Sequence, residues 1–254
     1  MKKVRVRLKK NNFITLLLTI FFTITFLYSG YKILDYLKDN YKNKKIQKTI
    51  NDKIIKISEG NKYTIDFNEL KKQNPDSIAY IKVNGTNINY VVVRGNDNSY
   101  YLKHNFNKEW NVSGWIFSDF RNKFDETDKN IVIFGHDTKD GSMFGTLVNI
   151  LNNDWQSNKD NLKITLITEM GTYYYEVFST YKIIPEDYYI NTEFSSIDEF
   201  GEFVNTIKSR TLYDYKNEVT KDDKILTLSS CLEYGHKRVV LHAKLINKEE
   251  NKKE

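Results

Sequence analysis

The stretch TLSSCLEYGHKRVVLHAKL, residues 227–245, contains the only cysteine in the 254-residue chain. Cys231 ends an apolar, β-branched run, and Arg238 opens a second such run seven residues later. Two runs joined by a short glycine-containing segment are typical of antiparallel strands. Because side chains alternate between the faces of a strand, we expect Ser229 to share a face with Cys231. The spacing therefore favours a thiol and a guanidinium as cross-strand neighbours.

The N-terminus has the features of a membrane anchor. Residues 1–12 carry six Lys and Arg and no acid, and residues 13–31 carry no charge. A helix that crosses a bilayer needs about 20 mostly apolar residues. The basic flank should stay in the cytoplasm. We expect an uncleaved, single-pass anchor in the cell membrane, with the rest of the chain extracellular; a cleaved signal peptide is the alternative.

The positive charge of the chain is concentrated in its first part. The whole chain has a net charge of +6, whereas residues 1–50 alone sum to +10, so residues 51–254 sum to −4. A nucleic-acid-binding domain would carry its basic surface on the folded part. We therefore expect no nucleic-acid partner. The N-terminal cations are explained by membrane orientation and attraction to anionic lipid.

The rest of the chain changes from a helical pattern to a strand pattern. Apolar residues recur at helical spacing up to residue 60, and then short runs with turn signals predict about eight strands and a few helices. Such spacing favours a closed or nearly closed β-barrel. Asp66 and either Ser195 or Ser196 are expected helix N-caps, and residues 142–154 are expected to form one short helix. The expected parts are a basic tail (1–12), a membrane anchor (13–31), a helical stalk (32–60), a catalytic barrel domain (61–247) and a charged tail (248–254).

A lone thiol outside the cell is either reactive, paired with another chain, or a small buried hydrophobe. A reactive thiol needs a proton partner, most often an imidazole. His136 is the strongest candidate, because it ends an apolar strand where the chain enters a loop. His104 and His236 are expected to be solvated, and His242 is expected to be structural.

Metal and cofactor signatures are absent from the sequence. It contains no C-x-x-C or H-x-x-x-H spacing, no phosphate loop and no calcium loop. One thiolate rarely holds zinc by itself. We expect no metal site and no cofactor.

Several of these segments together resemble the sortases, and within them class B. They are TLSSC at 227–231 with the strand-opening Arg238, IVIFGHDTKDGSMFGTL at 131–147, and DNSYYLKHNF at 97–106. The helix-bearing insert at 185–224 adds to the likeness. The resemblance runs from about Tyr63 to Leu245.

The resemblance implies a membrane-anchored thiol transpeptidase of Gram-positive bacteria, built on an eight-stranded β-barrel with accessory helices. Such enzymes cleave a sorting motif near the C-terminus of an exported surface protein through a thioester intermediate. An amine of a peptidoglycan precursor then resolves the thioester and fixes the protein to the cell wall. Class B members favour NPxTx-like motifs.

Carried onto this chain, the resemblance makes Cys231 the nucleophile and His136 the group that protonates the leaving amine and deprotonates the incoming one. Arg238 would donate hydrogen bonds to the substrate backbone or to the developing oxyanion, a role that suits a planar, permanently charged group.

Four further residues are expected to bind substrate. They are Asn98, Leu102, Ser229 and Tyr189, with Tyr189 favoured over its neighbour Tyr188. Ordinary packing within the barrel is the alternative for each of them.

The chain departs from the family pattern at three positions. Ser230 stands where Thr is more frequent, Asp137 where Asn is commoner, and Leu232 where a polar residue is frequent. These departures concern substrate preference. Two functional alternatives stay open: a thiol hydrolase with the same three residues, in which water replaces the amine, and a non-catalytic surface barrel that binds partners. A pilus-assembling sortase is a narrower option.

Overall fold

The computed structural model describes residues 5–58, 62–231 and 237–251. The chain divides into two compact units, Met1–Lys42 and Asn43–Glu254. A single continuous helix, α1 (Arg5–Lys53), begins in the first unit and ends in the second. Its segment from Phe13 onward is long and apolar enough to cross a membrane, by length and composition, which is consistent with the expected anchor.

Helix α1 ends earlier than the sequence pattern indicates. It stops at Lys53, and strand β1 (Ile55–Ser58) follows and pairs antiparallel with β2 (Lys62–Ile65). Ile50 and Ile54 are nearly fully buried among the side chains of the main core. The last turns of α1 are therefore part of the folded domain rather than a solvated connection.

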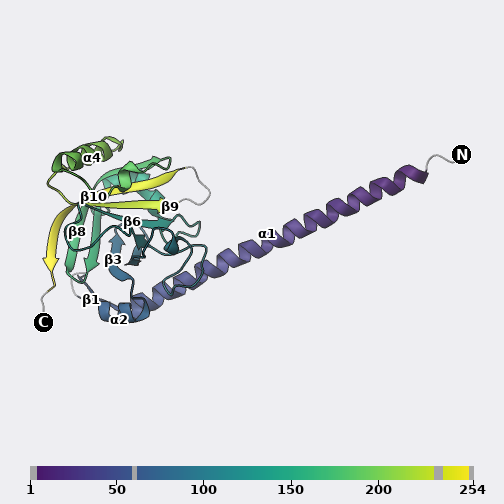
Figure 1. Cartoon of the computed structure of the whole chain (residues 1–254), viewed down its shortest axis with the longest axis horizontal. Coiled ribbons are helices and arrows are strands. Elements are labelled where there is room, and N and C mark those ends of the chain that lie inside the picture. Colours follow the sequence, from purple (N-terminus) through teal and green to yellow (C-terminus); the bar gives the residue numbers. More distant parts are fainter. Residues whose placement is uncertain (1–4, 59–61, 232–236, 252–254) are drawn as a thin grey trace. The chain divides into compact units, whose positions relative to one another are not determined.

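Eight of the described strands form a closed barrel, which confirms the expected fold. In spatial order they run β10-β8-β7-β3-β4-β5-β6-β9, and the barrel closes between β9 and β10. Figure 1 labels β3, β6, β8, β9 and β10 of this barrel. Most neighbours are antiparallel, but β6 pairs with β9 in parallel, and so does β4 with β5. The strands are β3 (Ser77–Val83), β4 (Asn89–Val93), β5 (Phe117–Ser118), β6 (Asn130–His136), β7 (Lys163–Thr168), β8 (Gly171–Ile183), β9 (Ile225–Cys231) and β10 (Arg238–Glu250).

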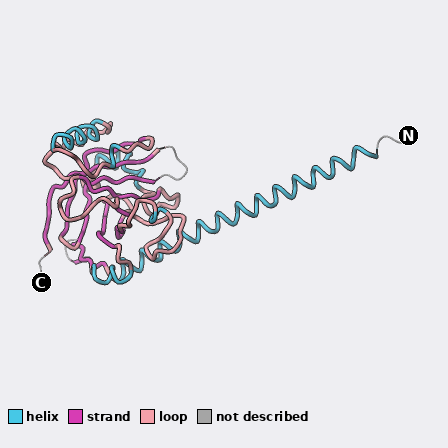
Figure 2. Tube along the Cα trace, in the orientation of Figure 1, coloured by secondary structure: helices cyan, strands magenta, loops and turns pink. Residues whose placement is uncertain are grey.

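Short helices and turns connect the strands (Figure 2). The side chains of Asp66 and Ser196 each accept a hydrogen bond from a backbone N–H three residues on, so both act as the expected N-caps. The helix expected over 142–154 is instead split, because Asn152 is extended and separates η2 from α3. The helices are α2 (Phe67–Gln73), η1 (Tyr100–Leu102), η2 (Leu147–Leu151), α3 (Asn153–Ser157), η3 (Tyr188–Ile190) and α4 (Ile197–Ser209).

Two hydrophobic clusters lie on opposite faces of β9. Leu226 and Leu228 belong to the main cluster that fills the barrel. Ile225 belongs to a second cluster, which Phe200 and Ile207 of α4 cover from outside. This division follows from the alternation of side chains along the strand. The face of β9 that carries the odd-numbered residues therefore looks toward the segment between β8 and β9.

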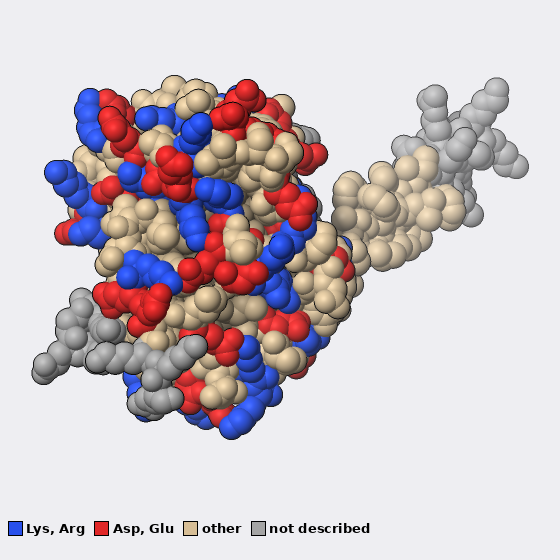
Figure 3. All heavy atoms as spheres, turned by 60° about the vertical axis from the view of Figure 1, so that its left-hand side comes forward, with Lys and Arg blue, Asp and Glu red and all other residues tan. Residues whose placement is uncertain are grey.

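The visible face of the domain in Figure 3 carries mixed Lys, Arg, Asp and Glu side chains with apolar patches between them. No single sign of charge dominates this face. Nucleic-acid binding would need a continuous basic surface, and this face does not offer one.

Ile50→Ala tests whether the end of α1 belongs to the core. We expect the free energy of unfolding to fall by about 2–5 kcal/mol, because the change removes a buried aliphatic side chain and leaves a cavity. Urea titration followed by tryptophan fluorescence measures it, since all three tryptophans lie in the Asn43–Glu254 unit. The control Ile184→Ala removes an isoleucine that is 55% exposed and should change the free energy far less. Equal effects would contradict a packed helix end.

Candidate active site

The parallel strands β6 and β9 end side by side. Their register sets Phe134 opposite Ser229 and His136 opposite Cys231, as the last pair of the ladder. Adjacent strands lie about 4.8 Å apart. The backbone thus brings the two residues that carry the proposed chemistry next to one another, although they are 95 positions apart in the sequence.

Strand β10 supplies the third residue. Val240 pairs with Ser229 in an antiparallel ladder, and Arg238 opens β10 two residues before Val240. Arg238 is half-buried at the start of β10, and its Nη1 donates to the carbonyl oxygen of Ser230 at 3.3 Å. The backbone therefore places Arg238 and His136 on the two strands that flank the end of β9.

Ser230 links the ends of β9 and β10. Its hydroxyl accepts a hydrogen bond from the backbone N–H of Val239 at 2.9 Å. The hydroxyl that Ser and Thr share is the group used here, so the replacement of Thr by Ser keeps this contact. The connecting residues 232–236, which include Leu232 and His236, lie outside the described residues.

A backbone carbonyl fixes the orientation of His136. The imidazole is 7% exposed, and its Nε2 lies 2.7 Å from the carbonyl oxygen of Leu102 in η1. A carbonyl oxygen only accepts hydrogen bonds, so Nε2 carries a proton and donates it. In the neutral ring the other nitrogen, Nδ1, is then the one with a lone pair that takes a proton. The carbonyl thus selects the tautomer.

Asn98 uses both ends of its amide to hold a neighbouring turn. Its Nδ2 donates to Oδ2 of Asp119 at 2.9 Å, and its Oδ1 accepts from the backbone N–H of Phe120 at 3.0 Å. The side chain is half-buried, and so is that of Leu102 nearby in the sequence. In this structure Asn98 stabilises the loop between β4 and η1 against the end of β5.

Tyr189 and Ser229 contact each other. Their hydroxyl groups lie 3.1 Å apart, and both residues are essentially buried. Tyr188 is half-buried, with the guanidinium of Arg210 stacked 5.1 Å from its ring centroid. Tyr189 therefore joins η3 to β9 directly, two positions before Cys231 at the end of the ladder.

An ion pair that the sequence reasoning missed connects these parts. Arg121 donates through Nε and Nη2 to the two oxygens of the fully buried Asp119, at 2.9 and 2.8 Å, and Nη2 also donates to the carbonyl oxygen of Ile190 at 3.0 Å. Burial raises the pKa of Asp119, but the hydrogen bonds from Arg121 and Asn98 outweigh it, so the pKa is lowered. The sequence feature that could have predicted this ion pair is an Asp and an Arg two residues apart at the end of an apolar run.

His242 is a structural histidine, as expected. Thr227 donates its hydroxyl proton to Oδ1 of Asn130 at 2.7 Å, so it accepts from Nδ1 of His242 at 2.8 Å. Nε2 of His242 then accepts from the hydroxyl of Tyr181 at 2.8 Å. The ring is fully buried, and desolvation lowers the pKa of His242 from 6.5 to about 3. Both nitrogens are occupied and the imidazole stays neutral.

This buried neutral imidazole makes stability depend on pH. Below pH 6.5 the unfolded chain protonates His242 and the native state does not, so protons favour unfolding until pH falls to about 3. We expect the free energy of unfolding to fall by about 1.4 kcal/mol per pH unit from this group between those limits. Urea titrations at pH 7, 6 and 5 measure the slope, and His242→Gln should reduce it. An identical slope in both proteins would contradict the buried neutral state.

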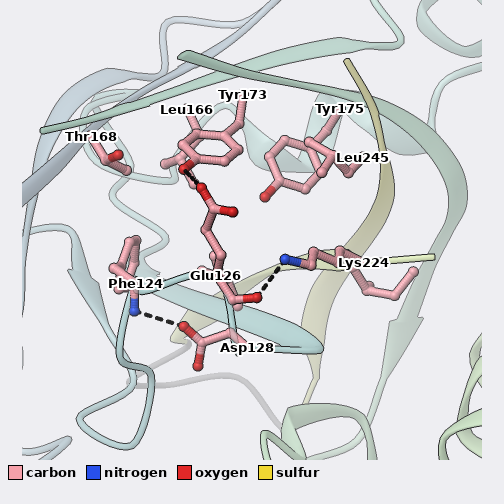
Figure 4. Close-up of a pocket in the computed structure, with 11 residues that line it drawn as sticks. Phe124, Glu126, Asp128, Leu166, Thr168, Tyr173, Tyr175, Lys224 and Leu245 are labelled. Atoms are coloured by element: carbon pink, nitrogen blue, oxygen red, sulfur yellow. Dashed lines mark hydrogen bonds between the residues drawn. The ribbon is translucent and has the colours of Figure 1, made fainter. Parts of the chain in front are cut away.

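A small cavity lies at the other end of the barrel. Lys224 and Ile225 line it where β9 begins, and Tyr173 of β8 donates its hydroxyl proton to Glu126 at 2.9 Å across it (Figure 4). Its volume of about 20 Å³ has room for about one water molecule. A peptide cannot occupy it. Among the described residues, no group of His, Cys, Asp and Glu is arranged to hold a metal ion.

Comparison with known proteins places this arrangement in a family. The family model described as the sortase domain matches residues 81–246. The chain belongs to the sortase family. Sortase B of Listeria monocytogenes is 32% identical over 95% of this chain and 100% of its own length, and sortase B of Staphylococcus aureus is 30% identical over 94% and 99%. A crystal structure of sortase B from Bacillus anthracis in complex with AAEK1 superposes with a TM-score of 0.73, at 34% identity, over 83% of this chain and 99% of the other.

The likeness to sortase B proteins extends over nearly the whole chain, including the N-terminal apolar helix. The chain is thus a sortase B cysteine transpeptidase, with an eight-stranded barrel preceded by a long apolar helix. The sortase family acts on proteins that carry sorting signals, so a protein of that kind is the substrate of this enzyme.

Proposed function

We propose that this enzyme cleaves an NPxTx-like sorting motif of an exported surface protein and transfers the protein to an amine of a peptidoglycan precursor. The observation that carries the proposal is the ladder pair of His136 and Cys231, and the position of Arg238 at the start of the neighbouring strand β10 supports it. The membership of the sortase B group supports the same chemistry.

Each of the three residues has one task in this mechanism. Nδ1 of His136 takes the proton of the Cys231 thiol, and the thiolate attacks the carbonyl carbon of the scissile bond. The oxyanion that forms accepts hydrogen bonds from Arg238. His136 gives its proton to the leaving amine as the carbon–nitrogen bond breaks, which leaves a thioester. The incoming amine then attacks the thioester, gives its extra proton to His136, and restores the thiolate.

We further propose that the N-terminal helix holds the enzyme in the cell membrane as a single-pass anchor. Residues 1–12 would be the cytoplasmic tail and 13–31 the membrane span, with the stalk (32–60), the catalytic domain (61–247) and the short charged tail (248–254) outside. The basic flank supports this orientation. No metal or cofactor enters the mechanism.

The groove that receives the motif is proposed to involve Asn98, Leu102, Ser229 and Tyr189. Leu102 is half-buried and its backbone carbonyl contacts His136, which supports its assignment to the groove. Ser229 and Tyr189 contact each other two positions before the ladder pair of His136 and Cys231. We assign Asn98 and Tyr189 to the support of the groove walls, because their polar groups are already bonded within the protein.

Replacement of the catalytic residues tests the mechanism. The full-length protein in detergent micelles is incubated with a fluorogenic NPQTN peptide, with and without triglycine as the amine. Cys231→Ala and His136→Gln should each lower kcat/KM at least about 10³-fold, and Arg238→Lys about 10²-fold, because Lys lacks the planar fork. Mass spectrometry should detect a thioester on Cys231 in the unchanged protein. His104→Gln, a histidine outside the site, is the control and should keep full activity.

The products decide between transferase and hydrolase. An amide-linked triglycine product supports transfer, whereas cleavage at an unchanged rate to the free acid supports the hydrolase alternative. No cleavage over a panel of such peptides, with Cys231 unreactive to alkylation, would contradict both.

Leu102→Ala tests the proposed groove. We expect KM for the peptide to rise about 5- to 50-fold, because an apolar contact of this size contributes about 1–3 kcal/mol to binding. The value of kcat should change less, since the backbone carbonyl that orients His136 is retained. Leu151→Ala, at the end of η2, serves as the control of equal size, and an equal rise of KM in both variants would contradict a specific contact at Leu102.

A further inference from the structure

The end of helix α1 is hydrogen-bonded to a loop of the barrel. Asn43, which is 1% exposed, donates through Nδ2 to the carbonyl oxygen of Gly114 at 3.0 Å and to Oδ1 of Asn111 at 3.2 Å. Asn111 is also fully buried and donates back to Oδ1 of Asn43 at 3.0 Å. Three buried hydrogen bonds thus connect one helical side chain to residues 111–114.

This loop is packed directly against the carbonyl groups of η1. Gly114 has a φ of +53°, and a Cβ added there would lie 2.3 Å from the oxygen of Tyr101 and 2.8 Å from the oxygen of Leu102. The backbone N–H of Trp115 donates to the oxygen of Tyr101 at 3.0 Å, and that of Asn111 donates to the oxygen of Lys103 at 2.9 Å. Only glycine fits at this close approach. The position of the loop therefore determines where the Leu102 carbonyl lies.

The Leu102 carbonyl is also the acceptor for Nε2 of His136, at 2.7 Å. A continuous path of contacts runs from the amide of Asn43 to Gly114, from Gly114 to the carbonyl of Leu102, and from that carbonyl to the imidazole. Each link is buried or half-buried, so water does not readily replace a lost contact.

We propose that Asn43 is a positioning residue for His136. The C-terminal part of helix α1 then helps to orient a catalytic side chain. Asn43 holds residues 111–114, these hold the Leu102 carbonyl, and the carbonyl holds the imidazole in the tautomer and direction that proton transfer needs. The proposal rests on the proposed catalytic role of His136. Because a misplacement of about 1 Å can cost about 10²-fold in rate, a displaced carbonyl lowers kcat without a change in substrate contacts.

Gln47 provides a matched control. It lies one helical turn after Asn43 and is 6% exposed. Its amide donates to the backbone oxygen of Asn89, the first residue of the barrel strand β4, and not to the 111–114 loop. Asn43→Asp and Gln47→Glu each replace a buried amide donor by a carboxylate of the same shape. Both variants lose a hydrogen bond of α1 to the barrel, but only one of them lies on the path to His136.

The test measures peptide cleavage by the full-length protein in detergent micelles, below the unfolding transition of every variant. We expect Asn43→Asp to lower kcat at least about 10-fold with KM within about twofold, and Gln47→Glu to leave kcat within about twofold. Asn43→Ala, which adds no charge, should show the same pattern more weakly and replaces Asn43→Asp if that variant does not fold. Equal kcat for the Asn43 and Gln47 variants overturns the proposal.

A double substitution separates positioning from a general structural effect. The rate at which iodoacetamide alkylates Cys231 is measured for each variant, alone and combined with His136→Gln. We expect Asn43→Asp to slow alkylation several-fold when His136 is present and to have no effect when it is absent. An equal effect in both backgrounds overturns the proposal. Full peptide cleavage by His136→Gln alone would instead contradict the catalytic role of His136, which is a separate result.

Discussion

The parallel pairing of β6 with β9 is the constraint on which the site depends. Parallel neighbours cannot be joined by a tight turn, so a long crossover must leave β6 and return to β9. Here that crossover contains the two barrel strands β7 and β8, with η2 and α3 before them and η3 and α4 after them. Because parallel strands run in the same direction, their carboxyl ends lie at the same level. His136 and Cys231, the last residues of their strands, become neighbours through this single geometric rule.

The surroundings of the strand ends are built from buried polar contacts. Asp119 with Arg121 and Ser229 with Tyr189 satisfy groups that would be costly to bury alone. Asn98 with Asp119, Arg121 with Ile190 and Tyr189 with Ser229 join elements that are distant in the sequence. Together these contacts hold the loop before η1, the end of β5 and η3 around the end of β9. Hydrogen-bonded backbone carbonyls, such as that of Leu102, complete the set. The described part of the site is thus held by contacts from several elements.

Much of this could be predicted from the sequence, for reasons that particular residues show. The alternating apolar runs predict the strands, and Asp66 and Ser196 predict their helices because capping is a local interaction. The end of α1 and the break at Asn152 were not predictable, since tertiary packing decides them. The ladder pair could be expected only by resemblance, as strand order is a property of the whole barrel. The sequence did not predict the roles of Asn43 and Gly114. An asparagine in a lysine-rich helix looks solvated, and the contacts of Gly114 depend on the folded structure.

The segment between β8 and β9 is attached to the rest of the site at two points of different kinds. Arg121 bonds its backbone at Ile190, and Ser229 bonds its side chain at Tyr189. The first attachment accepts any residue at position 190 and the second requires a hydroxyl on each side. If this segment were replaced by that of a relative, the new groove wall would be attached to β9 only if the replacement also had a tyrosine at position 189. The segment can therefore be exchanged as a unit, provided that the tyrosine is kept.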